Sequence, residues 1–300
     1  MLTYFFTNYG QDKIKGGIYL KNIGRTDLAL EDYEKSYKDE IYEYEINGYQ
    51  VSKIEVSIEN SKKIKKEAGL YYTITFNSLL EFAHDEEDAV SDVLKEILIE
   101  LMKEMDINEN PKVFVVGLGN AGVTADSLGP LVCSKLLVSK HLVDLNINDY
   151  NLGNLSAIAP GVMGQTGIQT SDIISAITKK IKPDLVIVVD ALAARNLKRL
   201  NRTIQITNTF IKPGAGIGNK NSKAISKDSL GCNVIAIGVP TVVEIASILV
   251  EVDSQKVEEL IDDELNYAVS CKEIDEMVRM LADIISKAIN LTIHDLVKYE

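Results

Sequence analysis

The first third of the chain alternates apolar and polar positions over short stretches. Residues 40–60 follow this two-residue period around Asn47-Gly48, a dipeptide typical of tight hairpin turns. Residues 70–76 are rich in β-branched and aromatic side chains and form a further candidate strand. We therefore expect a small antiparallel β element at about 40–76, near the N-terminal side of the fold.

The rest of the chain shows short, wholly apolar runs separated by stretches with helical periodicity. Uninterrupted β-branched runs are typical of parallel strands that are buried on both faces of a sheet. The predicted strands are 113–116, 185–189, 204–206 and 234–237, and the predicted helices are 85–105, 128–138, 172–181, 241–251 and 273–289. We expect a three-layer α/β/α fold with a mostly parallel central sheet.

Composition and charge limit the classes of partner that we expect this protein to bind. The 300 residues are 46% hydrophobic and 25% charged, with a formal net charge of −12. A surface of that charge repels phosphate backbones, so we expect no direct nucleic-acid partner. The apolar runs are too short to cross a membrane. The three cysteines lack zinc-site spacing, and we expect a cytoplasmic protein without a bound metal.

Two aspartates stand where predicted buried strands end. Asp126 lies in the loop after strand 113–116, and Asp190 directly follows strand 185–189. In open α/β sheets, ligands bind beyond the carboxyl ends of the strands. Partial burial raises the pKa of a carboxyl group, and two such groups that face one water can divide the acid and base roles of hydrolysis. Which aspartate takes which role stays open.

Two glycine-rich loops supply candidate substrate contacts. Closely spaced glycines let backbone N–H groups approach a ligand or an oxyanion. The candidates are Gly117, Gly119 and Asn120 in the loop before Asp126, and Gly214, Gly216 and Gly218 in a later loop. We expect the first set to shape the loop around Asp126 as well as to contact the substrate.

The first loop also matches the dinucleotide fingerprint GxGxxG, so a nucleotide-binding protein is one alternative. A dinucleotide site needs a helix that starts at the glycines. The β-branched Val123 and Thr124 disfavour such a start, and Pro130 fits the beginning of a helix several residues later. We therefore expect no cofactor and a loop that presents Asp126 at the crevice.

Several long stretches, in the same order, resemble the germination protease family of endospore-forming bacteria. They are GLGNAGVTADSLGP (117–130), SAIAPGVMGQTGIQTSDII (156–174), KPDLVIVVDALAARNLKRLNRTIQI (182–206), PGAGIGN (213–219) and VIAIGVPTVVE (234–244). The resemblance implies a fold similar to hydrogenase maturation proteases and a homotetramer in the forespore or spore core. It also implies an endopeptidase that degrades small acid-soluble spore proteins during germination, with its two essential aspartates at Asp126 and Asp190.

The resemblance further implies a zymogen that removes its own N-terminal segment. RTDLALE (25–31) is similar to the family's processing segment and to its substrate pattern of an acidic residue, an aliphatic residue, Ala, any residue and Glu. We predict self-cleavage between Asp27 and Leu28. The chain would then divide into a leader, 1–27, and a single peptidase domain, 28–300.

A metal-dependent maturation endopeptidase of the same fold is the closest alternative. Two carboxylates can hold a divalent ion, which would make the two aspartates metal ligands. The three histidines, His84, His141 and His294, are not well placed for a nickel-type site. Sensitivity to chelators distinguishes this alternative from a carboxylate pair that activates water directly.

Overall fold

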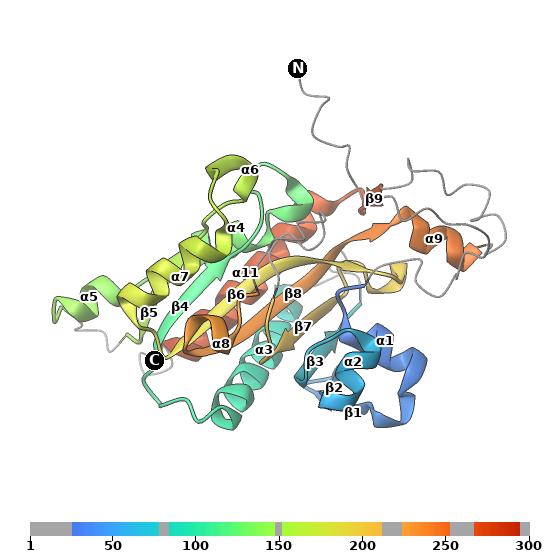
Figure 1. Ribbon diagram of the computed structural model, residues 1–300, viewed down its shortest axis with the longest axis horizontal. Coiled ribbons are helices and arrows are strands. Elements are labelled where there is room, and N and C mark those ends of the chain that lie inside the picture. The colour runs from blue at the N-terminus through green and yellow to red at the C-terminus, as the bar shows by residue number, and fades with distance from the viewer. Residues whose placement is uncertain (1–25, 78–83, 148–151, 212–223, 253–266, 295–300) are drawn as a thin grey trace, which may run out of the picture.

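A single mixed sheet organises the molecule, with helices on both of its faces (Figure 1). The computed structural model describes residues 26–77, 84–147, 152–211, 224–252 and 267–294. The strand order is β1-β2-β3-β7-β8-β6-β4-β5, and β9 pairs with β8. Strands β4, β5, β6 and β8 are parallel, whereas β7 and the N-terminal strands continue the sheet in antiparallel pairing. The predicted three-layer α/β/α fold is confirmed.

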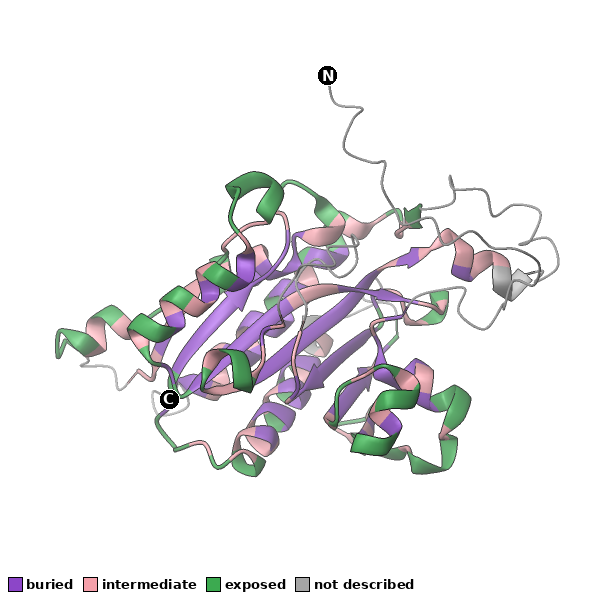
Figure 2. Cartoon of the chain, viewed as in Figure 1, coloured by how far each residue is buried: buried purple, intermediate pink, exposed green. Residues whose placement is uncertain are grey.

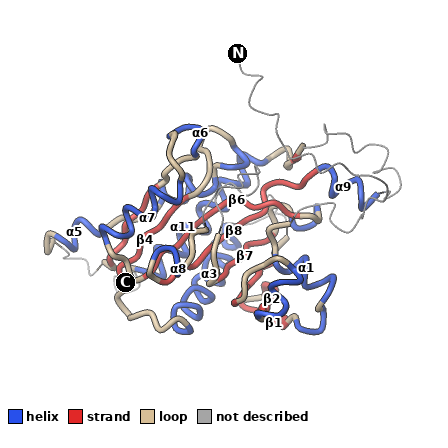
Figure 3. The backbone as a smooth tube through the Cα atoms, viewed as in Figure 1, coloured by secondary structure: helices blue, strands red, loops and turns tan. Residues whose placement is uncertain are grey.

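The elements are traced in Figure 3. The strands are β1 Tyr42–Ile46, β2 Tyr49–Val56, β3 Gly69–Thr75, β4 Lys112–Gly117, β5 Asn154–Ile158, β6 Leu185–Ala194, β7 Thr203–Thr207, β8 Asn233–Glu244 and β9 Ala268–Val269. The α-helices are α1 Ala29–Ser36, α2 Ile58–Ile64, α3 His84–Glu104, α4 Leu128–Lys135, α5 Lys140–Asp144, α6 Met163–Thr166, α7 Thr170–Ile181, α8 Lys227–Leu230, α9 Ile245–Val252 and α11 Ile274–Ile293. Short 3-10 turns are η2 Lys38–Glu40, η4 Thr124–Asp126 and η5 Leu197–Arg199.

The predicted antiparallel element forms around the expected turn. Asn47 and Gly48 have φ angles of 51° and 83°, so both adopt the left-handed backbone that a two-residue hairpin requires. Ile46 pairs with Tyr49 across that turn. Strand β3 then pairs with β7, so the hairpin extends the main sheet rather than forming a separate unit.

Strands β6 and β8 run beyond the ends that their apolar runs predict. They stay paired as far as Ala194 and Val243, with an irregularity after Leu192, while β4 stops at Gly117. The predicted end at residue 189 and the predicted start of a helix at 241 are therefore wrong. The part of β6 that follows Asp190, here called the β6 arm, and the matching part of β8 supply hydrogen-bond partners for each other's backbone. Pairing therefore continues after the apolar run ends. Strand β5 and helix α1 also lie where no element is predicted.

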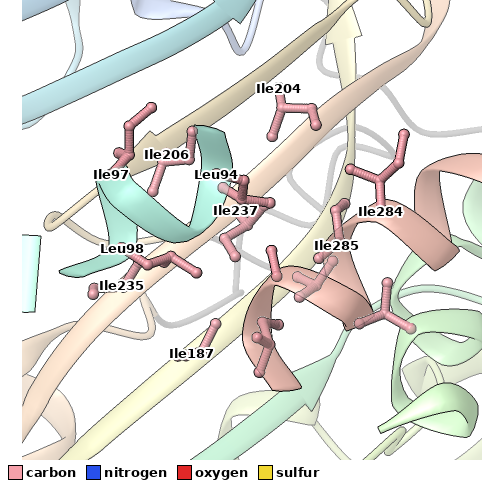
Figure 4. Close-up of a cluster of buried hydrophobic side chains, with 14 of the residues drawn as sticks. Leu94, Ile97, Leu98, Ile187, Ile204, Ile206, Ile235, Ile237, Ile284 and Ile285 are labelled. Atoms are coloured by element: carbon pink, nitrogen blue, oxygen red, sulfur yellow. The ribbon is translucent and has the colours of Figure 1, made fainter. Parts of the chain in front are cut away.

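The larger core lies on one face of the sheet, under α3, α4 and α11. Its side chains form one continuous apolar cluster, and the strands that it covers are buried along most of their length (Figure 2). The side chains labelled in Figure 4 come from α3, α11, β6, β7 and β8 and are Leu94, Ile97, Leu98, Ile187, Ile204, Ile206, Ile235, Ile237, Ile284 and Ile285. Tight packing of this kind fixes the strand positions on which the site depends.

The opposite face has smaller, separate clusters. One lies under α7 and α8 and contains Val186 and Val188 of β6, whereas Ile187 and Val189 face the larger core. Because side chains alternate along a strand, Asp190 faces the side of the smaller cluster. A second cluster on this side packs α1 against β2 and β3. Within the described ranges, no helix combines the length and apolar character needed to cross a membrane.

Candidate active site

Asp126 lies in the loop that follows β4, and Asp190 lies in the neighbouring parallel strand β6. The loop after β4 begins at Leu118, whose N–H donates to Val189 O at 2.8 Å, one residue before Asp190. The loop ends in η4, which contains Asp126 and lies against β6 and β8. The structure thus brings both aspartates to the carboxyl edge of the parallel strands, where ligands of α/β proteins bind.

A short hydrogen-bonded turn holds Asp126. Gly119 has a φ of 111°, and a Cβ atom there would lie 2.0 Å from the carbonyl oxygen of Asp126, so only glycine fits. The N–H of Asn120 donates to Asp126 Oδ2 at 2.8 Å. Asn120 Oδ1 in turn accepts from Gly122 N at 2.9 Å and from Gln165 Nε2 at 2.7 Å. Asn120 therefore orients the carboxyl group and ties its loop to α6.

The glycines of the first loop serve its packing. A Cβ atom at Gly117 would lie 2.1 Å from the carbonyl oxygen of Gly129 in α4, which explains that glycine without a ligand. Substrate contact by Gly117, Gly119 and Asn120 stays a prediction. Gly214, Gly216 and Gly218 lie outside the described residues, and so do residues 1–25 of the predicted leader.

The electrostatic environment of Asp126 suits proton transfer. Partial burial raises the pKa of its carboxyl group, and the hydrogen bond from Asn120 offsets part of that effect. Asp190 is also half-buried, and its Oδ1 accepts from Ala191 N at 2.9 Å. A carboxyl group that keeps its proton more readily than usual matches one need of acid–base hydrolysis.

The geometry of the first loop differs from a dinucleotide site, as predicted. Helix α4 begins at Leu128, after η4, so no helix N-terminus stands at the glycines. Pro130 lies in the first turn of α4, where its missing N–H has no intrahelical partner to lose. Among the residues with described positions, no group of three or more His, Cys, Asp and Glu side chains is arranged to hold a metal ion.

The predicted cleavage bond, Asp27–Leu28, lies on the arm of β6 that follows Asp190. Asp27 N donates to Ala193 O at 2.8 Å, and Asp27 Oδ2 accepts from Ala193 N at 2.9 Å. Gln205 of β7 brackets the bond: its Oε1 accepts from Ala29 N at 2.7 Å, and its Nε2 donates to Asp27 O at 3.3 Å. The side chain of Gln205 therefore holds the peptide groups on both sides of Leu28.

The residues that follow the Asp27–Leu28 bond are buried and hydrogen-bonded. Leu28 and Ala29 have no exposed surface. Glu31 is 6% exposed, and its carboxylate accepts from Arg195 N at 2.8 Å and from Asn196 N at 2.9 Å. A buried carboxylate requires such charge-assisted hydrogen bonds.

Sequence reasoning missed both Gln205 and the β6 arm. The available signal was the alternation TIQIT in β7, in which one long polar side chain points away from the large core.

Comparisons with known proteins test the family prediction. The sequence model of the germination protease family matches residues 24–258. The chain is 44% identical over 241 residues to the germination protease of Geobacillus sp. (strain WCH70), which covers 75% of this chain and 64% of that protein. The match thus spans slightly less than two thirds of that relative. With the germination protease of Caldanaerobacter subterraneus subsp. tengcongensis, identity is 39% over 308 residues, covering 90% of this chain and 94% of the relative.

Among solved structures, the [NiFe] hydrogenase maturation protease HycI from Thermococcus kodakarensis KOD1 is similar at 17% identity. The match covers 60% of this chain and 93% of that one, with a TM-score of 0.31. The family assignment rests on the sequence matches alone. The family's sequence model spans well over half of the chain, and the relatives are identical to it at about two residues in five. The resemblance carried by the motifs around Asp126 and Asp190 is thereby confirmed, and the chain belongs to the germination protease family.

Proposed function

We propose that this chain is an endopeptidase that degrades small acid-soluble spore proteins during germination, with Asp126 and Asp190 activating water. Membership of the germination protease family supports the activity and the substrate. The observation that carries the mechanism is the placement of two half-buried carboxyl groups, Asp126 in η4 after β4 and Asp190 in β6 just beyond the point where β4 stops. A cytoplasmic location in the spore core and a homotetrameric assembly belong to the same proposal, and native mass spectrometry measures the assembly.

In the proposed reaction, one carboxylate removes a proton from water while the other carboxyl group donates one. Burial raises the pKa of Asp126, which favours its protonated form, and the proposal therefore assigns the shared proton to this group before the reaction. Asp190 then acts as the base, and the new hydroxide attacks the peptide carbonyl carbon. The proton on Asp126 passes to the carbonyl oxygen and finally to the leaving amine. Because the two groups titrate together, their pH profile belongs to the pair.

The proposal includes self-processing at Asp27–Leu28. The bond lies against Ala193 and Gln205, and Leu28 is fully buried. Cleavage requires water and both carboxyl groups to reach this bond. A trimmed chain that begins at Leu28 supports this proposal, and a different new N-terminus in the mass spectrum contradicts it.

The test incubates the purified full-length chain with a small acid-soluble spore protein at mildly acidic pH. Asp126→Asn and Asp190→Asn are nearly isosteric variants that remove one carboxyl group each. We expect cleavage and self-trimming by the parent only, with activity unchanged by a chelator. Loss of activity on chelation would instead support the metal-dependent alternative, and activity in either variant would exclude the carboxylate pair.

A further inference from the structure

We propose that the edge of β6 beyond the end of β4, together with Gln205, is the peptide-binding site of this enzyme, and that residues 27–31 occupy it as a substrate would. The inference rests on the proposed function and names the groups that hold the substrate. For this to hold, the candidate base Asp190 and the predicted cleavage bond must both lie along the edge of β6 that β4 leaves uncovered. The register and hydrogen bonds of β6 meet this requirement.

The edge is defined by the alternate residues of β6. In a strand, the N–H and C=O of one residue point to the same side, and those of every second residue point to the same edge. Val189 is the last residue on this edge that a β4 residue opposes. The residues beyond it on the same edge are Ala191, Ala193 and Arg195.

Each of these edge positions has a partner that fits a substrate site. Ala191 N donates to the carboxylate of Asp190 itself. Ala193 makes two hydrogen bonds with Asp27, one through N–H and one through C=O. Asp27, which precedes the predicted cleavage bond, thus bonds to Ala193, which lies two strand positions, or roughly 7 Å, along β6 from Ala191. Addition of a chain to a free strand edge is a common mode of peptide recognition, and here a short contact at Asp27 leads directly into helix α1, which begins at Ala29.

Gln205 reaches the same place from the other side of β8. Gln205 and Asp190 are both paired with Gly238, so the three form one row across β7, β8 and β6 with their side chains on one face. Their Cα atoms are roughly 10 Å apart, since neighbouring strands are about 4.8 Å apart. A Cβ atom at Gly238 would lie 2.3 Å from Leu192 Cδ1, so the glycine leaves room for Leu192 between the two polar residues.

The contacts define the chemistry of the occupant. Leu28 fills an apolar cluster with Leu192, Ala194 and Val243, which takes an aliphatic residue after the cleaved bond. Ala29 is fully buried, so the next position admits only a small side chain. The N–H groups that bind Glu31 select a carboxylate at the fourth position. The site thus takes a peptide that is extended at the residue after the cleaved bond and helical from the next residue on, and the chain's own segment competes with it.

Because the added peptide competes with residues 27–31, one substitution is expected to change peptide affinity in opposite directions when it is made in the peptide and in the protein. The probe is a fluorescein-labelled peptide with the sequence of residues 22–35, bound to full-length Asp126→Asn protein and followed by fluorescence anisotropy. Glu31→Gln in the peptide replaces a carboxylate in charge-assisted hydrogen bonds, so we expect its affinity to fall about tenfold. Glu31→Gln in the protein loosens the competing segment, so affinity for the unaltered peptide is expected to rise about fivefold.

The matched control is Glu34→Gln, made in the peptide and in the protein. Glu34 pairs with Arg199 at an exposed position, so both changes are expected to leave the dissociation constant within twofold. In Glu31→Gln protein, the further change Gln205→Leu is expected to weaken peptide binding about tenfold. Thr73→Val is its control, because Thr73 neighbours Gln205 on β3 and its buried hydroxyl makes no hydrogen bond with the described residues.

The outcomes separate this inference from the proposed function. If the parent chain cleaves the peptide but Glu31→Gln acts with the same sign in both places, or in neither, the peptide site is wrong and the peptidase stands. If binding follows the expected signs but the parent never cleaves the peptide, the proposed function is wrong. Because the peptide substitutions leave the protein unchanged, the test still decides when a protein variant fails to fold.

Discussion

On one face of the sheet, α3 and α11 lay a continuous cover of leucine, isoleucine and valine side chains over the strands. On the other face, the apolar cover is divided between α7, α1 and the β6 arm. The row Thr73–Gln205–Gly238–Asp190 runs between these clusters. The comparison teaches that one face supplies the rigidity, while the other has separate apolar clusters with a row of polar groups between them.

The largest expected effect on stability comes from the apolar face. Leu98 of α3 is fully buried against the strands, so Leu98→Ala removes packed volume that the surroundings cannot refill. We expect the free energy of unfolding to fall by about 2–5 kcal/mol in urea titrations. The matched control, Leu197→Ala, changes a side chain that is 43% exposed and is expected to lower it by less than about 1 kcal/mol. Equal effects would mean that this face is not the stabilising one.

A smaller effect is expected in the polar row. Gly238→Ala places a Cβ atom against Leu192 and pushes that side chain away from its position between Asp190 and Gln205. We expect a loss of about 1–3 kcal/mol in stability and a larger proportional loss of peptidase activity. Gly164→Ala is the control, since no atom lies within 4 Å of a Cβ there. Unchanged activity in Gly238→Ala would show that the row does not position the site.

Asp126→Asn is expected to reduce activity while slightly increasing stability. Because burial raises the pKa of Asp126 in the folded state, the charged carboxylate disfavours folding at neutral pH. The penalty disappears as pH falls through the folded pKa toward that of the unfolded chain, near 4. The variant is therefore expected to gain less than about 1 kcal/mol near pH 7 and nothing near pH 3. Thermal melts at both pH values measure the difference, and a variant less stable at pH 7 contradicts the account.

The smallest effect concerns a polar residue at the end of the apolar face. His294 is 1% exposed, its Nε2 lies 2.9 Å from Leu137 O, and burial lowers its pKa. Below pH 6.5 the unfolded chain binds a proton more readily than the folded chain, so stability falls until pH passes the lowered pKa. We expect a loss of less than about 1 kcal/mol between pH 7.5 and 5.5 that His294→Gln abolishes. Identical pH dependence in parent and variant would assign the loss to other groups.

The comparison of faces also shows what the sequence could reveal. The apolar face was predictable, because its helices and strands repeat apolar residues with clear periods. The hairpin at Asn47-Gly48 was predictable because the turn needs two residues with positive φ. Asp126 and Asp190 stood out because the ends of buried strands identify the edge of a parallel sheet.

The remainder depends on pairings that no single stretch encodes. The β6 arm continues past Asp190 because β8 continues beside it, so neither strand reveals its own length. Gln205 has the pattern of a solvent-facing residue, and its role appears only when residues 27–29 are placed above it. Helix α1 is held by contacts with segments that are distant in the sequence, among them the hydrogen bonds that Arg195 N and Asn196 N donate to Glu31.

The central claim is that Asp126 and Asp190 act as one catalytic unit. The most direct measurement compares kcat/KM on one peptide substrate for the parent, for Asp126→Asn, for Asp190→Asn and for the double variant. We predict that each single substitution lowers kcat/KM by at least about a thousandfold and that the double variant is no slower than the worse single one. Losses that multiply in the double variant, or a single variant that retains most of the activity, would contradict the claim.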